Sequence, residues 1–334
     1  KLKTERLVRR TVIRPFVPLF ILASTLCAYA SITTGGRDDV VFMDLFAADS
    51  LAASVMWDIR LPRTVVAMCV GVNLGLAGLI LQAITRNPLA SPAILGINQG
   101  AAFGLVIGLV FPAYAALIGL KTLAIIGAFT AGVVTFTIAG GLKGRIDGLR
   151  LVLGGVAVGA FSYAMVRFTF TLEDNLAREV LRWTVGNITD MRWVDVHTIA
   201  GWSAGGLIAT ALITQRLNLM ALGEASSAGL GSDPRLTLLI GAVISAILTG
   251  TSVAVAGPIA FVGLVVPHVC RMIFGVDHRR LVFVVAMVGA VLMMAADAVS
   301  KWLTAPIETP IGVIVAMIGV PCFLYQALFA KDIE

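Results

Sequence analysis

The sequence predicts an all-α membrane protein with about ten membrane-spanning helices. Of the 334 residues, 58% are hydrophobic and only 13% are charged, whereas about 25% are charged in a soluble domain. So little charge cannot cover a protein surface in water, and most of this surface must therefore face lipid. The 34 glycines fit the same class, because small residues let helices approach closely in a bilayer.

The apolar residues form runs that are each close to the roughly 20 residues needed to cross a bilayer. The eighth run is short and follows Gly257-Pro258, where one helix breaks and another starts. We expect a single membrane domain over residues 1–334. Its spans are expected near residues 15–33, 63–84, 93–111, 119–141, 149–170, 196–215, 235–256, 258–273, 281–301 and 311–329.

The lysines and arginines predict the orientation of these spans. With the N-terminus inside, 16 of them fall on the inside and 9 on the outside. Because basic residues are in excess on the cytoplasmic side of membrane proteins, both ends are expected inside (N-in, C-in). The basic residues lie in short clusters between apolar runs and form no continuous basic face, so a nucleic-acid partner is not expected.

The first segment resembles a secretory signal. Residues 1–14 carry six basic residues, an apolar run follows, and Ala28-Tyr29-Ala30 resembles a cleavage site. We expect residues 1–14 to be a cytoplasmic segment that precedes an uncleaved first helix, because the later spans already make the chain a membrane protein. Cleavage near residue 30 is the alternative.

Three hydrophilic stretches separate the runs. Residues 34–62 and 171–195 are expected outside, the second with Trp183 and Trp193 in the interfacial belt. Residues 216–235 are the longest inside loop. Its apolar helical pattern and Gly-rich turns predict two short helices that lie at the cytoplasmic surface and dock a partner.

The centres of the spans hold almost no charge, which argues against an ion-coupled transporter, because ion coupling needs a binding site near the midplane. Asp297 is the main exception. It lies four residues before Lys301, towards the outer end of its span, and local pairing or capping is its expected role. There is no P-loop motif, no metal site and no catalytic triad. A transporter of this kind must therefore take its energy from a partner.

Several segments, in order along the chain, resemble the permease subunits of ABC importers for ferric siderophores, haem and cobalamin. A single Asn-Pro or Gly-Pro dipeptide is weak evidence for the resemblance, but the ordered set of segments covers nearly the whole chain. The segments are RLPR (60–63), GLILQ (78–82), TRNPLASP (85–92), LGIN (95–98), LMALGEASSAGLG (219–231), AGPIAFVGLVVPH (256–268), TPIG (309–312) and IGVP (318–321).

The resemblance implies a type II ABC importer permease fold in the bacterial inner membrane. It also implies the partners: a second permease copy (identical or a paralogue), a pair of ATP-binding subunits and an extracytoplasmic binding protein. ATP and Mg would be bound by the partner ATPase, so no cofactor and no metal are expected in this chain.

The same resemblance assigns roles to individual residues. Arg60, Arg63 and, approximately, Lys301 match the family's outward cations that meet the binding protein; the lysine loses the bidentate fork of an arginine. Without the family, the two arginines could equally be membrane-edge anchors. The inside loop would couple to the ATPase through Leu222, Gly223, Glu224, Ala225, Gly229 and Leu230.

Glu224 either meets a basic groove on the ATPase or caps a local helix. The breaks at Asn87, Pro88, Gly257 and Pro258 are either hinges near the path or ordinary loop punctuation. The leading hypothesis is a permease that imports a ferric siderophore, of the citrate or hydroxamate type. A haem or cobalamin permease is the alternative within the family, and an ion-coupled secondary transporter is the alternative outside it. A membrane-embedded enzyme is not expected.

Overall fold

The computed structural model describes residues 18, 20–35, 43–44, 50–93, 95–141, 148–169, 171, 178, 180–181, 183–305 and 307–329. These residues form a bundle of helices, and no strand is assigned among them. The first helix is Phe20–Thr33. It is followed by α2 (Leu51–Val55), η2 (Met56–Arg60), α3 (Leu61–Thr85), α4 (Ile97–Val110), α5 (Pro112–Ile118), α6 (Leu120–Ile138), α7 (Gly148–Thr169), α9 (Trp193–Ala221), α10 (Glu224–Gly229), α11 (Pro234–Ala256), α12 (Val262–Phe274), α13 (His278–Leu303) and α14 (Ile311–Phe329).

Each of the ten predicted spans contains a helix among the described residues. Six helical stretches of the described residues are long and apolar enough to cross a membrane, the first of them running from α2 through α3. The pair α4 and α5, bent by 108°, makes a seventh if it counts as one span. The shorter apolar helices are Phe20–Thr33, α12 and the first part of α14, Ile311–Tyr325. The all-α membrane class is therefore confirmed, with several spans that are shorter than the sequence pattern suggested.

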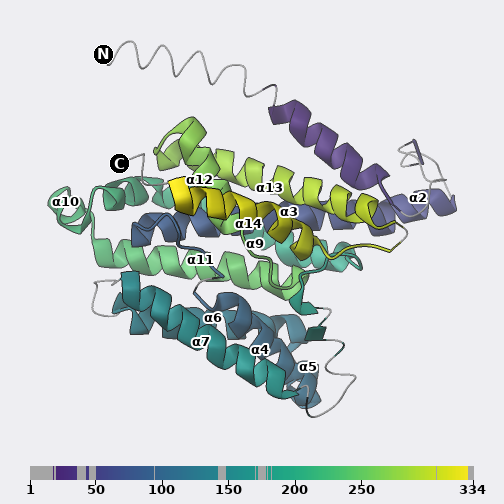
Figure 1. Ribbon diagram of the computed structural model, residues 1–334, viewed down its shortest axis with the longest axis horizontal. Helices are drawn as coiled ribbons and strands as arrows, with labels where there is room; N and C mark the ends of the chain where they lie inside the picture. Colours follow the sequence, from purple (N-terminus) through teal and green to yellow (C-terminus); the bar gives the residue numbers. More distant parts are fainter. Residues whose placement is uncertain are drawn as a thin grey trace.

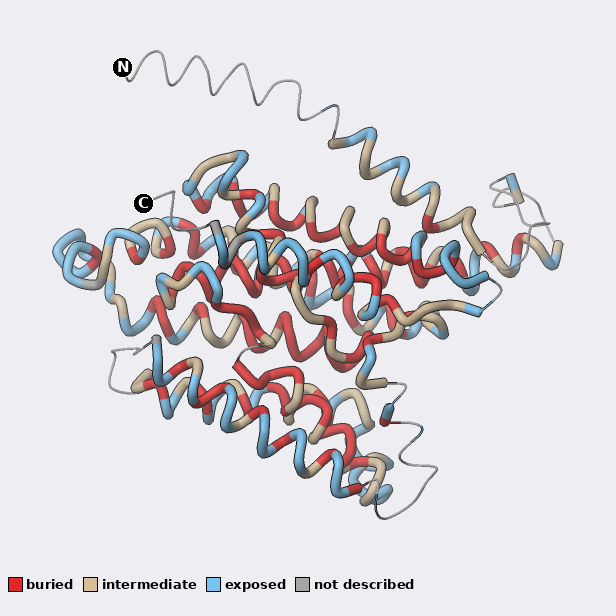
Figure 2. Tube along the Cα trace, viewed as in Figure 1, coloured by how far each residue is buried: buried red, intermediate tan, exposed pale blue. Residues whose placement is uncertain are grey.

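The bundle has two groups of helices joined by α11 (Figure 1). In one group, α3 packs against α9, α11, α12 and α13; in the other, α4 packs against α6 and α7. Of the candidate spans in the described residues, the one that contains α3 is the most buried (Figure 2). The surface helices keep exposed apolar side chains for lipid. Two glycine contacts bring α3 close to its neighbours: a Cβ on Gly71 would overlap the carbonyl oxygen of Gly289, and one on Gly78 would overlap that of Gly263.

Two predicted boundaries were wrong. The second span is helical from Leu51, inside the expected 34–62 loop, because Ser50 caps α2 by accepting a hydrogen bond from the amide of Ala53 at 3.0 Å. Pro62 is tolerated where it stands because it lies in the first turn of α3. The second wrong boundary is the end of the span predicted at 196–215. Its helix, α9, continues to Ala221, so the 216–235 loop contains one separate short helix, α10, where two were predicted. Residues 1–14 lie outside the described part.

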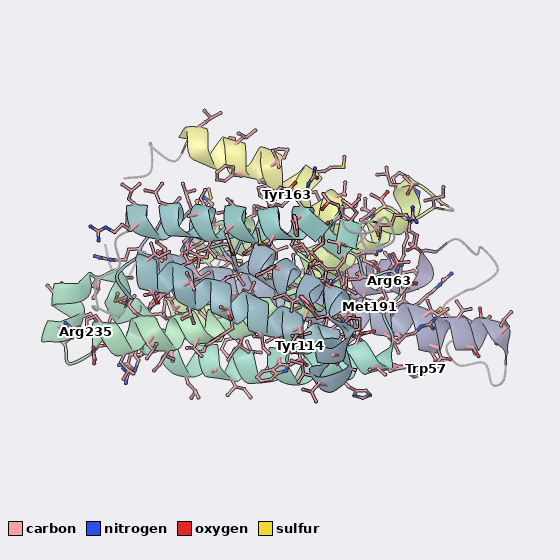
Figure 3. The ribbon with its side chains drawn as sticks, turned by 90° about the horizontal axis from the view of Figure 1, so that it is seen from below. Trp57, Arg63, Tyr114, Tyr163, Met191 and Arg235 are labelled. Carbon is pink, nitrogen blue, oxygen red and sulfur yellow. The ribbon has the colours of Figure 1, made fainter. Side chains whose placement is uncertain are left out.

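The ends of the bundle match the predicted sides. Figure 3 shows Trp57, Arg63 and Met191 at one end and Arg235 at the other. We call these the outer and inner ends, following the orientation that the basic residues predict. A buried set of charges lies at the outer end, and the projecting helix α10 lies at the inner end.

Candidate functional site

A buried set of charges ties the helices together at the outer end. We call Ser31, Arg63, Asp297, Lys301 and Glu308 the outer charge network. The carboxylate of Asp297, which is fully buried, accepts from Arg63 Nε at 2.6 Å through one oxygen and from Lys301 Nζ at 2.6 Å through the other. The network therefore joins α3 to α13 through one carboxylate.

Further contacts of the outer charge network reach two other segments. Ser31, near the end of the first helix, donates to Asp297 at 2.7 Å, and its carbonyl oxygen accepts from Lys301 at 2.7 Å. Arg63 also pairs with Glu308, just before α14. Two cations thus face two carboxylates, so the network is neutral as a whole, which is the condition under which charges persist in a membrane interior.

Arg60 has a separate role beside the network. Its guanidinium donates to the carbonyl oxygens of Thr33 at 2.7 Å and Ile32 at 3.2 Å. These are among the last carbonyls of the first helix, which have no partner within the helix, and a basic side chain is a common cap for them. Arg60 therefore fixes the outer end of the first helix to the start of α3.

The structure brings Arg60, Arg63 and Lys301 to the same end of the molecule, as the sequence predicted. However, the exposed fractions of the three residues are only 5%, 4% and 3%, and the hydrogen bonds and ion pairs described above join them to other residues of the same chain. The expectation that they face outward is therefore corrected: the carboxylates of Asp297 and Glu308 and carbonyl oxygens at the end of the first helix bind these cations. Their role in docking a binding protein stays a prediction.

The local pairing predicted between Asp297 and Lys301 is confirmed. The pairing of Asp297 with Arg63 was missed, because the two residues are 234 positions apart. One signal could have suggested it: a carboxylate within a span needs a cationic partner, and Arg63 is predicted at the same side of the membrane.

The inner end is built differently. The short helix α10 projects from the bundle after α9 (Figure 1). Gly223, with φ +100°, makes the turn into α10, and Gly231, with φ +81°, makes the turn out of it. Leu222 and Leu230 flank the helix, and each is 63% exposed. The two leucines leave apolar surface beside a projecting helix, which a partner could cover.

The predicted coupling residues all lie in this projection. Leu222 and Gly223 precede α10, Ala225 and Gly229 belong to it, and Leu230 follows it. Glu224 begins α10, but its side chain lies outside the described part of the structure. The loop is therefore short, helical and bounded by glycine turns, as a lever requires, while its coupling role stays a prediction.

A hydrogen-bonded cluster lies behind the projection. Asn218, on α9, donates to the carboxylate of Asp277 at 2.8 Å and accepts from the amide of His278 at 2.9 Å. The Asn218 amide holds the pKa of Asp277 below its usual value, because it stabilises the charged carboxylate. Asp277 also caps α13 by accepting from the amide of Arg279. The end of α9, and with it α10, is thereby attached to the start of α13.

A second contact at the inner end attaches α3 to α12. Gln82 donates to the carbonyl oxygens of Gly263 at 3.2 Å and Leu264 at 3.3 Å, and its own oxygen accepts from Arg271. A cavity of about 600 Å³ opens here, lined in part by Arg86, Leu222 and Arg271. Asp277 lines the same cavity, so the inner end combines a projecting helix with an open cavity that holds charges of both signs.

The predicted helix breaks are confirmed as breaks. After α3, Arg86 adopts a left-handed conformation with φ +51°, and the side chain of Asn87 accepts from the amide of Leu89 at 2.9 Å in a turn that contains Pro88. After α11, Gly257, with φ +72°, and Pro258 stop the helix. The chain restarts at α12 after Phe261, which is left-handed without being glycine. A hinge role at either break stays a prediction.

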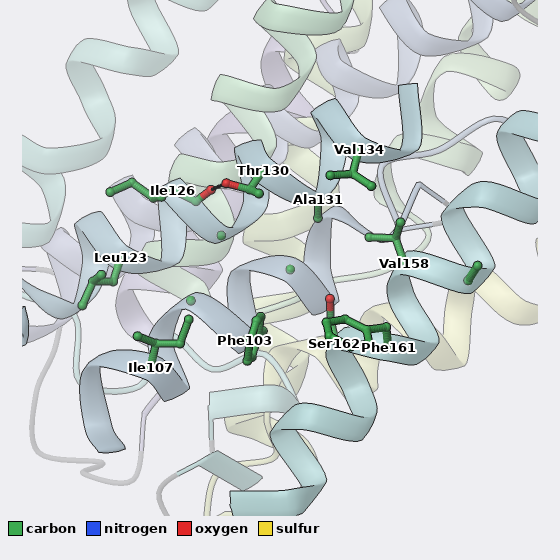
Figure 4. A pocket seen from close by; sticks show the side chains of 14 residues that line it. Phe103, Ile107, Leu123, Ile126, Thr130, Ala131, Val134, Val158, Phe161 and Ser162 are labelled. Carbon is green, nitrogen blue, oxygen red and sulfur yellow. Dashed lines mark hydrogen bonds between the residues drawn. The ribbon is translucent and has the colours of Figure 1, made fainter. Parts of the chain in front are cut away.

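An apolar cavity of about 470 Å³ lies between α4, α6 and α7 (Figure 4). Phe103 and Ile107 of α4, Leu123 and Ile126 of α6, and Phe161 of α7 line it. No charged residue lines it among those described. Its described lining is mainly apolar, with the hydroxyls of Thr130 and Ser162 as its polar side-chain groups.

Comparisons with known proteins agree with this architecture. The family model described as the FecCD transport family matches residues 19–329. The Fe(3+)-citrate import system permease protein YfmD of Bacillus subtilis is 36% identical over 87% of this chain and 89% of its own length. The hemin transport system permease protein HmuU of Yersinia pestis is 37% identical over 83% of this chain and 85% of its own length.

A solved structure, described as an inward-facing metal-chelate type ABC transporter, superposes with a TM-score of 0.81 at 28% sequence identity. The superposition covers 95% of this chain and 99% of the other.

Proposed function

Because the chain belongs to the FecCD transport family and is a multi-pass permease of the inner membrane, we propose that it is the translocating subunit of an ATP-driven importer of ferric siderophores. One observation of the structure carries the proposal: α10 projects from the inner end with Leu222 and Leu230 exposed beside it. The sequence has no P-loop, and the proposal therefore includes a separate ATP-binding subunit that acts on the inner end of this chain.

The proposal includes three partners. A pair of ATP-binding subunits docks on α10 and carries ATP and Mg, a binding protein docks at the outer end, and a second permease copy completes the path. The hydrogen bond that Asn218 donates to Asp277 and the one that it accepts from the amide of His278 support the first of these, because they attach the α10 lever to α13. A rigid attachment is needed for closure of the ATPases to move the spans.

The proposed substrate is a ferric chelate of the citrate type. The similarity to an Fe(3+)-citrate permease over most of both chains supports it. A haem importer is the second candidate, and the comparable similarity to a hemin permease supports that. The two candidate substrates differ in charge and polarity: ferric citrate is a hydrophilic anion, whereas haem is a large, flat and mainly apolar molecule.

The test is uptake by the complete importer in liposomes. We expect iron supplied as ferric citrate to accumulate only when this chain, the ATPase, the binding protein and ATP are all present. A permease carrying Leu222→Asp serves as the uncoupled control. Accumulation of haem or cobalamin in place of iron would move the assignment within the family, and uptake by the chain alone, driven by an ion gradient, would overturn it.

A further inference from the structure

A groove lies between α11 and the group of helices that contains α4, α6 and α7. Its volume is about 380 Å³. Because α11 joins the two groups of the bundle, a molecule that fills this groove also holds the groups together. We call it the inter-group groove. Most of its described lining is apolar, including Phe129, Val133 and Phe136 of α6, Leu151 of α7, and Leu239 and Val243 of α11.

The inter-group groove opens on the lipid-facing surface. Val133 and Leu239 line it and are exposed, so they continue the apolar surface of α6 and α11. The hydroxyl groups on its wall have partners within the chain: Thr135 donates to the carbonyl oxygen of Leu95 at 3.0 Å, and Thr137 donates to that of Val133 at 2.7 Å. A hydrocarbon chain in the groove would therefore leave neither hydroxyl without a partner.

The length of the inter-group groove matches one leaflet of a bilayer. Along α11 its lining runs from Arg235 to Ala246, which is about 16 Å at the rise of an α-helix. Half of the hydrocarbon core of a bilayer is about 15 Å thick. On α6 the lining begins at Phe129, in the middle of the helix, and continues to its inner end. The groove therefore fits one acyl chain of a lipid in the inner leaflet.

Two opposite charges lie at the mouth of the inter-group groove. Asp233 and Arg235 line its inner end, where Figure 3 labels Arg235. Asp233 Oδ1 caps α11 by accepting from the amides of Arg235 at 2.9 Å and Leu236 at 3.3 Å. Within the described part of the chain, Asp233 Oδ2 accepts no hydrogen bond, and the guanidinium of Arg235 makes no hydrogen bond or ion pair. A carboxylate oxygen and a guanidinium are thus available to a ligand.

This pair of charges matches a zwitterionic headgroup. A phosphate pairs with a guanidinium through two parallel hydrogen bonds, and a primary ammonium group has three N–H donors for a carboxylate. Phosphatidylethanolamine carries both groups. Phosphatidylglycerol has no cation for Asp233, and the quaternary ammonium of phosphatidylcholine has no N–H to donate. Basic groups between membrane helices on the cytoplasmic side are typical sites for lipid headgroups.

We propose that the inter-group groove binds one phosphatidylethanolamine molecule of the inner leaflet. An acyl chain lies between α6 and α11, the phosphate binds Arg235, and the ammonium group binds Asp233 Oδ2. The lipid holds α11 against the group that contains α6. This inference goes beyond the proposed function, because the lipid is not transported and its site needs none of the three partners.

The test uses the complete chain in phosphatidylcholine nanodiscs that contain a trace of phosphatidylethanolamine with a photoreactive diazirine in one acyl chain. Mass spectrometry identifies the labelled peptides, and added unlabelled lipids compete with the probe. Asp233→Asn keeps a good helix cap but removes the charge, Arg235→Gln removes the cation, and Arg235→Lys keeps it. Leu239→Trp fills the groove from an exposed position. Arg280→Gln and Leu212→Trp change exposed residues outside the groove and are the matched controls.

We expect labelling within residues 129–137 and 236–246. About one tenth as much phosphatidylethanolamine as phosphatidylglycerol should displace the probe. Arg235→Gln should lower labelling about tenfold, Asp233→Asn should remove the preference for phosphatidylethanolamine, and Leu239→Trp should abolish labelling of the groove. Arg235→Lys and both controls should stay near wild type.

Three results would overturn the inference. The first is labelling confined to other helices, and the second is equal competition by the two lipids in the wild type. The third is an unlabelled groove whose residues cross-link to a second permease copy, which would show that protein covers it. None of these results concerns uptake by the complete importer, so the proposed function is tested separately.

Discussion

The outer and inner ends of this bundle hold their charges in opposite ways. At the outer end, Arg63, Asp297 and Lys301 are at least 96% buried and bonded to one another. At the inner end, Asp277 is exposed, and α10 projects between two exposed leucines. The outer end is thus held together from within, whereas the inner end presents surface that its own chain leaves uncovered.

The difference indicates where a partner can act. A buried neutral network resists displacement, because separating any one charge leaves another unpaired in a dry environment. Covering an exposed apolar projection breaks few existing contacts, and the burial of its leucines contributes favourable free energy to binding. We therefore expect force to enter at α10 and the outer charge network to keep the first helix, α3 and α13 together.

The largest effect is expected from breaking the outer charge network at its centre. Asp297→Ala leaves Arg63 and Lys301 with a single carboxylate, that of Glu308, and should destabilise the protein by about 3–5 kcal/mol. Thermal unfolding in detergent measures the change. The double variant Asp297→Asn with Lys301→Met leaves the neutral pair of Arg63 and Glu308, and should recover much of the loss. Equal stability of the single and double variants would contradict this role of charge balance.

The next effect concerns the inner end. Leu222→Asp and Leu230→Asp should each weaken binding of the partner ATPase about tenfold or more, because exposed apolar anchors dominate such contacts. The unfolding temperature should stay close to wild type, since both side chains are largely exposed. Val276→Asp, at the same end and 73% exposed, is the control. An equal loss of ATPase binding in the control would show that α10 is not the contact.

A smaller effect is expected at Arg60. Arg60→Ala removes two hydrogen bonds to the end of the first helix and should cost about 1–2 kcal/mol. Unfolding in detergent again measures it, and hydrogen exchange near residues 30–33 should become faster. If Arg60 acts only by docking a partner, both measurements would stay at the wild-type value while binding of that partner weakens.

The smallest effect is expected at Asp277. Asp277→Ala removes the cap of α13 and the bond to Asn218, for about 0.5–1 kcal/mol in this exposed position. The folded pKa of Asp277 lies below its usual value, so its contribution is present above about pH 4 and is lost as the pH falls through the folded pKa. The stability difference between wild type and variant should therefore shrink on acidification. A difference that grows instead would contradict the shift.

The positions of the helices could be predicted because apolar runs of fixed length carry that information. The breaks at Asn87-Pro88 and Gly257-Pro258 were also visible, since proline and glycine act locally. The start of α2 was missed: the polar residues of 34–62 concealed a capped helix at Leu51. The overrun of α9 to Ala221 was missed because the apolar pattern of the loop fits both one long helix and a separate short one.

The candidate site shows the same division between local and distant information. Lys301 and Asp297 are four residues apart, so their pairing follows from helix geometry. Arg63 meets Asp297 only because α3 packs against α13 through Gly71 and Gly289, and no local pattern contains that contact. The burial of Arg60, Arg63 and Lys301 was missed because each of them contacts residues that are distant in the sequence.

Hydrogen exchange of the permease, with and without its partner ATPase, tests the central claim most directly. We predict that addition of the ATPase slows exchange in residues 222–231, while residues 60–63 and 297–301 keep the rates of the isolated permease. Protection at the outer residues without any at α10 would contradict the claim that the chain is driven from its inner end.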